Sequence, residues 1–376
     1  MNIILLYGGK SGEHEISLVS ASSVARNISA EHNVNLISIS KDGKWYLQDK
    51  SVLDNLKKDK NYTLSVNPDP KKLVSIIPGG KKDKAFYADG NYIPCDVALP
   101  ILHGTYGEDG TIQGLFEMAD VPYAGCQVLS SSATMDKYTT KVLWKNAGLP
   151  VVPFVCITRA DVNDKNSYDA LVQKAIEELK FPLFVKPCSA GSSDGANKAL
   201  NMQELDKALK EAFEWDNKVL IEKAIDAREV ECSVTGNSVT SNPQNKETML
   251  KSYGPGEIVP KHVFYDYDAK YNDPDGAELK IPALLSTEKL EYIRETAKKA
   301  YKAVDASGLS RVDFFIDRKT GDIYLNEINT LPGFTSISMF PKMCQSEGLE
   351  FTALVDLLLT EAVENYKAKS LLRTSR

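Results

Sequence analysis

The sequence predicts a mixed α/β protein, partly α/β and partly α+β, built from two or three domains. Its 376 residues exceed the roughly 100 to 200 residues of one domain, and 43% of them are hydrophobic. An apolar run at 3–7 followed by Gly8 and Gly9 indicates a buried strand that enters a glycine turn, and a helix is expected at 17–29. In the last third, a helix at 287–303 precedes a β-hairpin with the turn RKTGD.

Composition excludes several classes of protein. The 45 Lys and Arg residues against 51 Asp and Glu residues give a net charge of −6, without the basic excess of a nucleic-acid-binding protein. No apolar stretch approaches the roughly 20 residues of a membrane span. The six cysteines are scattered and only four histidines are present, so neither a zinc site nor a disulfide framework is expected. We therefore expect a cytoplasmic protein with reduced thiols and no membrane partner.

Three segments follow the opening strand and helix. Residues 41–93 are rich in Lys, Asp, Asn and Gly and predict a small surface meander inserted into the first domain. The glycine-rich loop at 103–114 follows an apolar run, which is a common position for a ligand. A helix is expected at 132–147, and Gly148 and Pro150 end it at a domain junction.

The middle of the chain predicts a strand at 181–186, the small-residue loop CSAGSSDG at 188–195 and a helix at 202–215. Asn201 and Glu204 stand three residues apart at the start of this helix, as a capping pair does.

The next two segments differ in regularity. Residues 219–236 predict two strands that flank a polar turn. Residues 251–282 hold many Pro, Gly, Tyr and Asp residues with little periodicity. So long an irregular stretch is typical of a disordered segment or of a functional lid.

The hairpin of the last third gathers charged side chains on one face. If its turn centres on Thr320, Asp313 lies opposite Glu327 and Arg311 lies opposite Asn329. All four side chains then share a face because strand side chains alternate with period 2. Two carboxylates and an amide oxygen suit Mg²⁺ held together with nucleotide phosphates, and a salt-bridged face has the same pattern.

Two other patterns suit a phosphate-containing ligand. Lys186 ends an apolar strand directly before the loop at 188–195, whose backbone N–H groups can approach an oxyanion closely. The backbone at 222–225 can pair with an adenine edge, and Glu229 can accept ribose hydroxyls. An exposed edge strand with alternating charge explains these later residues equally well.

Together these motifs resemble the ATP-grasp superfamily and, within it, the D-alanine:D-alanine ligases. The matching stretches are GGKSGEHEIS at 8–17, LHGTYGEDGTIQG at 102–114, MDKYTTK at 135–141, VKPCSAGSSDG at 185–195, IEKAIDAREVE at 221–231, YDYDAKY at 265–271 and NEINTLPGFTSISMF at 326–340. Any one of them could occur by chance, whereas seven in the family's order are highly specific.

The resemblance implies an ATP-grasp fold with an N-terminal doubly wound α/β domain. Three domains are expected, at 1–125, 126–221 and 222–376, with the insertion at about 41–93 and the lid loop at about 251–282. The implied activity joins two D-alanine molecules through an acyl phosphate, with release of ADP and phosphate, for peptidoglycan synthesis. The small-molecule partners are D-alanine and ATP, and a homodimer is expected.

The resemblance also assigns site residues. The nucleotide contacts would be, for the phosphates, Lys137, Lys186 and Lys270; for the adenine, Phe184, Glu222, Lys223, Ala224, Ile225 and Phe315; and for the ribose, Glu229. The ligands of two Mg²⁺ ions, with Mn²⁺ as a substitute, would be Asp313, Glu327 and Asn329. For the first D-alanine, Glu13 would bind the ammonium group and His103 would orient the substrate. Ser192 and Tyr271 would form a hydrogen-bonded set with Glu13 that closes the lid. Arg311 and the backbone of Gly333 would stabilise the oxyanion, and Ser338 would bind the carboxylate of the second D-alanine.

Several alternatives stay open at this point. Tyr271 favours an amine nucleophile, since relatives that join D-alanine to D-lactate tend to lack it, but D-serine as the second substrate is not separated from D-alanine. From another class, a non-catalytic nucleotide-binding regulator should have lost a metal ligand or Arg311, and these residues are all present.

Overall fold

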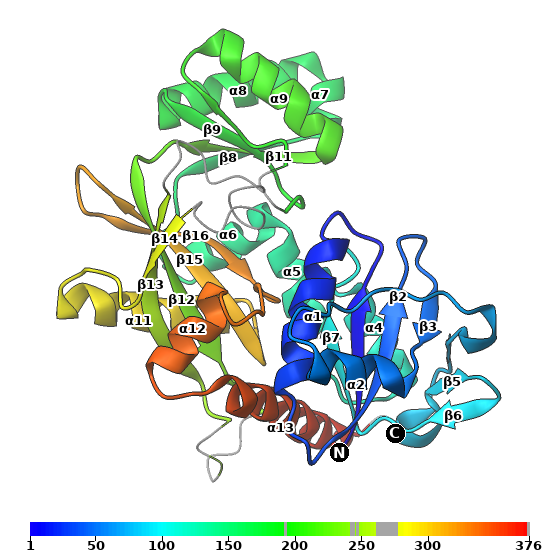
Figure 1. Ribbon diagram of the computed structural model, residues 1–376. Helices are drawn as coiled ribbons and strands as arrows, with labels where there is room; N and C mark the ends of the chain where they lie inside the picture. The colour runs from blue at the N-terminus through cyan, green and yellow to red at the C-terminus, as the bar shows by residue number, and fades with distance from the viewer. Residues whose placement is uncertain (192–193, 241–244, 246–247, 261–276, 374–376) are drawn as a thin grey trace.

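The computed structural model describes residues 1–191, 194–240, 245, 248–260 and 277–373. Figure 1 shows a layered N-terminal region in blue and cyan, a separate central region in green, and a third region built around a sheet in yellow-green and orange. In the part of the chain so described, no helix has the length and apolarity needed to cross a membrane. All six cysteines are free thiols, as expected.

The first sheet has the expected α/β architecture. Its strand order is β3-β2-β1-β7, and β1 pairs in parallel with both β2 and β7. The elements are β1 (Asn2–Gly8), α1 (His14–Asn27), β2 (Asn33–Ile39), β3 (Trp45–Leu47), β7 (Val97–Ile101) and α4 (Thr111–Ala119). Both faces of β1 are covered, since Ile3 and Leu5 share a core with α1 whereas Ile4 and Leu6 share another with α4.

Residues 41–93 contain a small meander, but β3 within this range belongs to the first sheet. Three short strands form a separate antiparallel sheet in the order β4-β5-β6. The elements between residues 50 and 93 are α2 (Lys50–Lys58), the 3-10 helix η1 (Pro70–Lys72), β4 (Ser75–Ile76), α3 (Lys81–Lys84), β5 (Phe86–Ala88) and β6 (Asn91–Ile93). Buried Phe86 attaches the insertion to the α4 side of the first sheet.

The prediction of one helix at 132–147 is wrong. The chain forms two helices, α5 (Val128–Met135) and α6 (Lys137–Asn146). Between them Asp136 is extended, and its carboxylate accepts a hydrogen bond from the Thr139 N–H at 2.7 Å. This N-cap starts a new helix in a new direction, although the apolar spacing continues across the break.

The second sheet is antiparallel and has the order β10-β9-β11-β8. Its elements are β8 (Phe154–Thr158), α7 (Arg159–Asn163), α8 (Lys165–Leu179), β9 (Leu183–Pro187), β10 (Asn197–Ala199), α9 (Met202–Trp215) and β11 (Lys218–Lys223). The capping pair is confirmed, because Asn201 accepts from the Glu204 N–H at 3.0 Å and Glu204 accepts from the Leu200 N–H at 2.8 Å. The expected boundary between residues 221 and 222 falls inside β11.

The third sheet is antiparallel with the order β14-β13-β12-β15-β16. Its elements are β12 (Ala227–Thr235), β13 (Lys251–Pro260), β14 (Ala277–Lys280), α11 (Thr287–Ala303), β15 (Leu309–Asp317), β16 (Ile323–Asn329), α12 (Met339–Ser346) and α13 (Phe351–Ser370). The two strands expected within 219–236 are therefore β11 and β12, and they belong to different sheets. Helix α6 joins this third core through buried Trp144, whose indole N–H donates to the Ala300 carbonyl at 3.0 Å.

The prediction of an irregular segment at 251–282 is wrong at both ends of that range. These ends form the strands β13 and β14, which pair with each other. The glycines that suggested irregularity allow close packing instead. A Cβ at Gly254 or Gly256 would lie 2.5 Å or 2.6 Å from a methionine sulfur of α12. Residues 261–276 lie outside the described residues, so the lid remains a prediction for that part of the chain.

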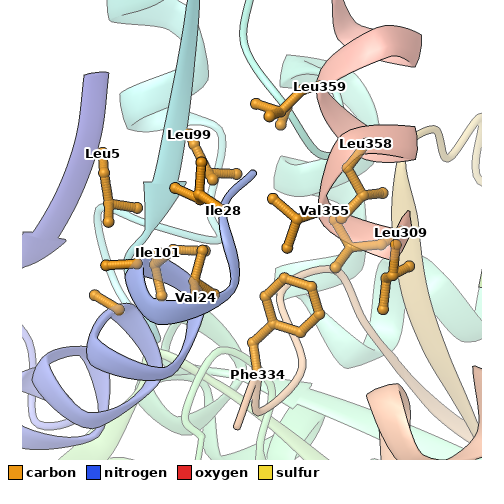
Figure 2. Packing of buried hydrophobic residues seen from close by; sticks show 14 of the residues in the cluster. Leu5, Val24, Ile28, Leu99, Ile101, Leu309, Phe334, Val355, Leu358 and Leu359 are labelled. Carbon is orange, nitrogen blue, oxygen red and sulfur yellow. The ribbon is translucent and has the colours of Figure 1, made fainter. Parts of the chain in front are cut away.

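The last helix, α13, returns to the first domain. Its Val355 and Leu358 point toward Val24 of α1 and Leu99 of β7, and Phe334 lies below them in the same cluster (Figure 2). The first sheet therefore completes one of its two cores with residues from the far end of the chain.

Glu361 of α13 is buried where α13 meets the third sheet. Its Oε1 accepts a hydrogen bond from the Gly308 N–H at 2.9 Å, and burial raises the pKa of this carboxyl to about 8. Gly308 has a φ of +72°, and a Cβ there would lie 2.7 Å from Gly125 Cα. The protonated carboxyl thus sits where two backbone segments touch.

We expect Glu361→Gln to reduce the loss of stability between pH 5 and pH 8. The folded-state pKa, about 8, lies above the value of roughly 4.3 for an unfolded Glu, so the wild type loses stability as the pH rises through this window. Glutamine keeps an acceptor for Gly308 and never ionises. The free energy of unfolding is measured with urea at pH 5 and at pH 8. Its decrease between these two pH values should be smaller in the variant than in the wild type by about 1 kcal/mol or more.

The matched control is Glu214→Gln at an exposed position of α9, which should leave the pH dependence unchanged. An unchanged pH dependence in Glu361→Gln would contradict the raised pKa.

Candidate active site

The second sheet has an apolar face and a polar face. Val185, Val219 and Ile221 pack against helices α8 and α9. Because neighbouring residues point to opposite faces, Lys186 and Glu222 lie on the other side, which faces α6 and the third sheet. This side holds three of the expected nucleotide contacts, which are Phe184, Lys186 and Glu222.

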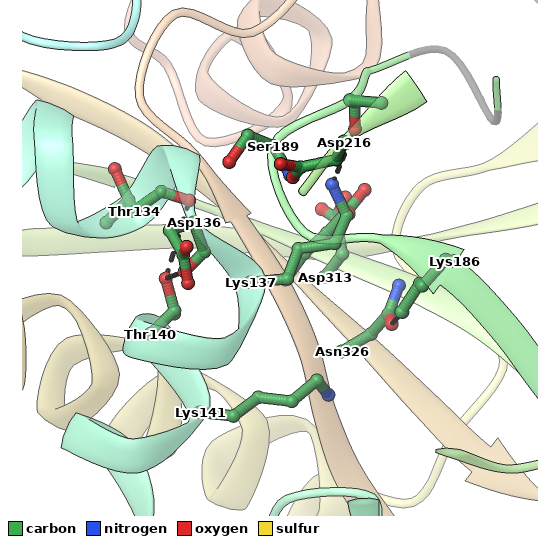
Figure 3. A network of polar contacts seen from close by, with 12 residues as sticks. Thr134, Asp136, Lys137, Thr140, Lys141, Lys186, Ser189, Asp216, Asp313 and Asn326 are labelled. Carbon is green, nitrogen blue, oxygen red and sulfur yellow. Dashed lines mark hydrogen bonds and ion pairs between the residues drawn. The ribbon is translucent and has the colours of Figure 1, made fainter. Parts of the chain in front are cut away.

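Three charged groups meet in the interior of this face. Lys141 Nζ lies 2.7 Å from Glu222 Oε1, and Lys186 Nζ lies 2.7 Å from Glu222 Oε2. Lys186 also donates to Asn326 Oδ1 at 3.2 Å, a contact drawn in Figure 3. Burial alone would raise the pKa of Glu222, but the two lysines lower it below its ordinary range.

The two lysines respond to burial differently. Burial lowers the pKa of Lys141, and Glu222 only partly compensates for it. At Lys186 burial also acts downward, but Glu222 and Glu327 outweigh it and the pKa is raised. Lys186 is therefore a firmly protonated cation at the edge of the cluster.

Lys137, the first residue of α6, lies against the start of the loop at 188–195. Its Nζ donates to the Ala190 carbonyl at 2.8 Å and lies 3.8 Å from Glu327 Oε2. The Ser189 N–H donates to Asp216 Oδ2 at 2.7 Å. The loop is thus held by α6 on one side and by the end of α9 on the other.

The hairpin register is confirmed. Asp313 lies opposite Glu327, and Arg311 lies opposite Asn329. Arg311 donates to both oxygens of Asp313, each at 2.7 Å, and lies 3.1 Å from Glu231 Oε2 of β12. Burial would lower the pKa of Arg311, but the two carboxylates hold it well above its ordinary value.

The donor set on this hairpin fits a magnesium ion. It offers two carboxylates and one amide oxygen, and Asn329 Oδ1 is oriented by the Leu331 N–H at 3.1 Å. Among the residues that the structure describes, no three His, Cys, Asp or Glu side chains are grouped to hold a metal. A cation here would therefore combine Asp313 and Glu327 with Asn329 and with oxygens of a ligand.

The expected adenine and ribose residues lie on, or directly after, interior strands of the second and third sheets. Phe184 lies opposite Glu222 in the second sheet, and Phe315 lies opposite Glu229 in the third. The backbone at 222–225 is partly used by the fold, since two of its N–H groups donate hydrogen bonds to carbonyls of the chain. These bonds run from Lys223 to Pro153 at 3.1 Å and from Ala224 to Pro182 at 3.0 Å. Adenine recognition by backbone would therefore fall on the other groups at 222–225.

Glu13 lies between two glycine loops. A Cβ at Gly104 would lie 2.7 Å from Glu13 Oε2, and one at Gly191 would lie 3.4 Å from it. Both glycines therefore leave room for this carboxylate. The first sheet and the phosphate-side loop approach each other at this residue.

His103 is buried below Glu13, and both its ring nitrogens have partners in the protein. Nδ1 lies 3.0 Å from the Leu331 carbonyl, and Nε2 lies 2.9 Å from Ser20 Oγ. Burial would lower the pKa of His103, but Glu108, 3.7 Å away, outweighs it and the pKa is raised. Its expected role in orienting a substrate would be exercised through this network.

Gly333 and Ser338 lie side by side before α12. A Cβ at Gly333 would lie 3.1 Å from Ser338 Oγ. Ser338 Oγ accepts from the Thr335 N–H at 3.1 Å, and the Thr335 hydroxyl lies 2.8 Å away. Three of the expected residues, Ser192, Lys270 and Tyr271, lie outside the described residues.

Sequence reasoning missed three residues of this site, which are Lys141, Glu231 and Glu108. Each lies inside a quoted motif, but none was assigned a role there. The available signal was helical spacing, since Lys141 is one turn after Lys137 and so shares its side of α6. The partners of Glu231 and Glu108 follow from tertiary contacts alone.

Both halves of the chain match models of one family. Residues 2–126 match the D-ala D-ala ligase N-terminus, and residues 143–360 match the D-ala D-ala ligase C-terminus. The chain belongs to the D-alanine:D-alanine ligase family. The expected resemblance and the ATP-grasp fold of this family are thereby confirmed, and so is membership of a family of ligase enzymes.

Relatives in this family match the chain from end to end. A D-alanine--D-alanine ligase of Treponema denticola is 52% identical and covers 100% of both chains. One from a Thermoanaerobacter species is 45% identical and covers 98% of each.

Solved structures of this ligase family share the fold. The D-alanine-D-alanine ligase from Coxiella burnetii superposes with a TM-score of 0.80 at 31% identity, covering 98% of this chain and 96% of its own. The VanG D-Ala:D-Ser ligase from Enterococcus faecalis has a TM-score of 0.79 at 36% identity and covers 96% and 99%.

We expect Glu327→Ala to weaken magnesium binding while the fold persists, because it removes one of the two opposed carboxylates. The measurement is the melting temperature with ADP alone and with ADP and Mg²⁺. A ligand at 100 times its Kd stabilises the folded state by about 2.7 kcal/mol, so the wild type should gain several degrees from magnesium. The variant should lose most of that gain.

Asp322→Ala, at the exposed turn of the same hairpin, is the control and should keep the magnesium effect. An equal gain in Glu327→Ala and in the wild type would sink the metal assignment.

Proposed function

We propose that this protein joins two D-alanine molecules into D-alanyl-D-alanine, with ATP converted to ADP and phosphate, for peptidoglycan synthesis. The observation that supports it most is the meeting of two sheets at one cluster. Lys186 of the second sheet reaches Asn326 of the carboxylate-bearing hairpin at 3.2 Å. Cations suited to phosphates thus stand next to oxygens suited to Mg²⁺, within a chain that is 52% identical to a D-alanine--D-alanine ligase.

The chemistry requires an activated carboxylate. A carboxylate is a poor acyl donor because it has no good leaving group, so the γ-phosphoryl group of ATP is first transferred to the first D-alanine, which becomes an acyl phosphate. The amine of the second D-alanine then attacks the carbonyl carbon, and phosphate leaves. Lys137 and Lys186 would neutralise phosphate charge during the transfer, with Lys270 reaching the γ-phosphate from the lid.

Two Mg²⁺ ions would be held by Asp313, Glu327 and Asn329 together with oxygens of the nucleotide. When bound, the ions neutralise charge that develops on the transferred phosphoryl group. Arg311, which donates to Asp313, would stabilise the substrate oxyanion together with the Gly333 N–H.

The amino-acid substrates would lie between the first and third regions. Glu13 would bind the ammonium group of the first D-alanine, and Ser338 would bind the carboxylate of the second. His103 would keep the first site in place through its buried contacts. Ser192 and Tyr271 would join Glu13 in closing the lid, which protects the acyl phosphate from water.

The adenine would lie between Phe184 and Phe315 beside residues 222–225, with Glu229 on the ribose. We further propose a three-domain division in which the whole of β11 belongs to the second domain, a homodimer, and action in the cytoplasm, where free thiols and ATP are maintained.

A second candidate is ligation of D-alanine to D-serine. It is favoured by the likeness to the VanG D-Ala:D-Ser ligase, which at 36% is more identical than the Coxiella burnetii enzyme at 31%.

Purified protein with ATP, Mg²⁺ and D-alanine should release phosphate and form D-alanyl-D-alanine, detected by mass spectrometry. D-serine and D-lactate added in competition over a range of pH should each yield less product than D-alanine. A larger yield with D-serine would favour the second candidate. Nucleotide binding without phosphate release or dipeptide would defeat the proposal and indicate a regulator.

A further inference from the structure

Lys141 is a fully buried lysine beside the proposed phosphate site, yet it is not among the expected nucleotide contacts. Its side chain is 0% exposed, and its Nζ lies 2.7 Å from Glu222 Oε1. A buried ammonium group is costly unless an opposite charge compensates it, and many folds place an apolar residue at such a position. The presence of this charge therefore calls for a functional explanation.

The arrangement around Glu222 supplies one. This carboxylate uses one oxygen for Lys141 and the other for Lys186. Without Lys141, Glu222 and Lys186 would form a neutral pair, and the carboxylate would compete with a phosphate group for Lys186. With Lys141 the three groups carry a net charge of +1, which is available to an anion at Lys186, the least buried of the three, with a side chain that is 9% exposed.

The position of Lys141 is set by a different part of the fold from that of its partners. Lys141 belongs to α6, which Trp144 fixes to α11 by the 3.0 Å bond to Ala300. Glu222 and Lys186 belong to the second sheet. Figure 3 shows Lys141 extending from α6 toward the strands from which Lys186 projects. The ion cluster therefore spans two cores.

We propose that Lys141 is a positioning residue for the nucleotide: it neutralises Glu222, so that Lys186 presents its charge to the phosphates. This role rests on the proposed ATP-dependent function. Lys141 acts through Glu222 and Lys186 and is not itself assigned a phosphate contact.

Lys141→Met tests the role by removing the charge and keeping most of the volume. Binding of Mg-ADP, measured by calorimetry, should weaken about tenfold or more, since a charge-assisted contact at Lys186 would be lost. In the ligation assay the KM for ATP should rise by a similar factor while kcat falls less. The control is Lys145→Met, one turn further along α6 and exposed, which should bind Mg-ADP as the wild type does.

The double variant Lys141→Met with Glu222→Gln separates charge balance from mere packing. It removes both charges and keeps the shapes of the side chains, so Lys186 again has no excess anion beside it. Mg-ADP affinity within about threefold of that of Glu222→Gln alone supports the proposal, because Lys141 then matters only while Glu222 is charged. If Lys141→Met does not fold, the double variant decides by the same criterion.

Two results would overturn the role of Lys141. One is wild-type Mg-ADP affinity in Lys141→Met. The other is a double variant that binds Mg-ADP more than about tenfold more weakly than Glu222→Gln alone, because Lys141 would then matter even without the charge of Glu222. A wild-type protein that binds Mg-ADP but forms no dipeptide would defeat the proposed function and leave the binding comparison valid, whereas one that binds no Mg-ADP would defeat both.

Discussion

The shared carboxylate of Glu222 is the interaction on which the site depends. It draws a lysine from α6 and a lysine from β9 to within 2.7 Å, so the second sheet and the helix that borders the third core must dock in one orientation. Burial of three charges is tolerated only when each of them has an ion-pair partner. A displacement of α6 would leave at least one of the three without its partner. The cluster therefore favours specificity of docking more than stability.

Each cation described at the site lies next to an acidic side chain. The net charge of −6 gives no hint of an anion site, and the cations here are each restrained by acids. Lys186 is held by Glu222, Lys137 lies near Glu327, and Arg311 binds Asp313. Each acid lies on a strand and each is a neighbour that a bound cation or phosphate could displace. In the absence of a ligand the cations of the site are thus paired with acidic side chains, and a bound ligand can replace these partners.

Local patterns predicted local structure well. The capping of α9 by Asn201, the bounds of α11 and the register of Asp313 against Glu327 all depend on residues close in the chain, and all were predictable. The failures share another cause. The break at Asp136 comes from a side-chain cap that interrupts a continuous apolar pattern, and the regularity of β13 comes from packing of Gly254 and Gly256 against α12.

The site was predictable only where a motif named its residues. Lys141 and Glu222 lie in different motifs, and nothing in either motif states that one neutralises the other. Glu231 pairs with Arg311 because β12 and β15 are neighbours, which is a property of sheet order and not of local sequence. Contacts between sheets therefore set the limit of the sequence-based prediction.

The return of α13 to the first sheet bears on how the first domain is completed. In the chain, β1, α1 and β7 precede the third sheet, whereas the helix that covers one side of their core follows it. The apolar surface formed by Val24 and Leu99 has no cover from α13 until that helix is in place. The first domain therefore cannot complete its core from its own residues, and a chain cut before α13 would leave that core open to water.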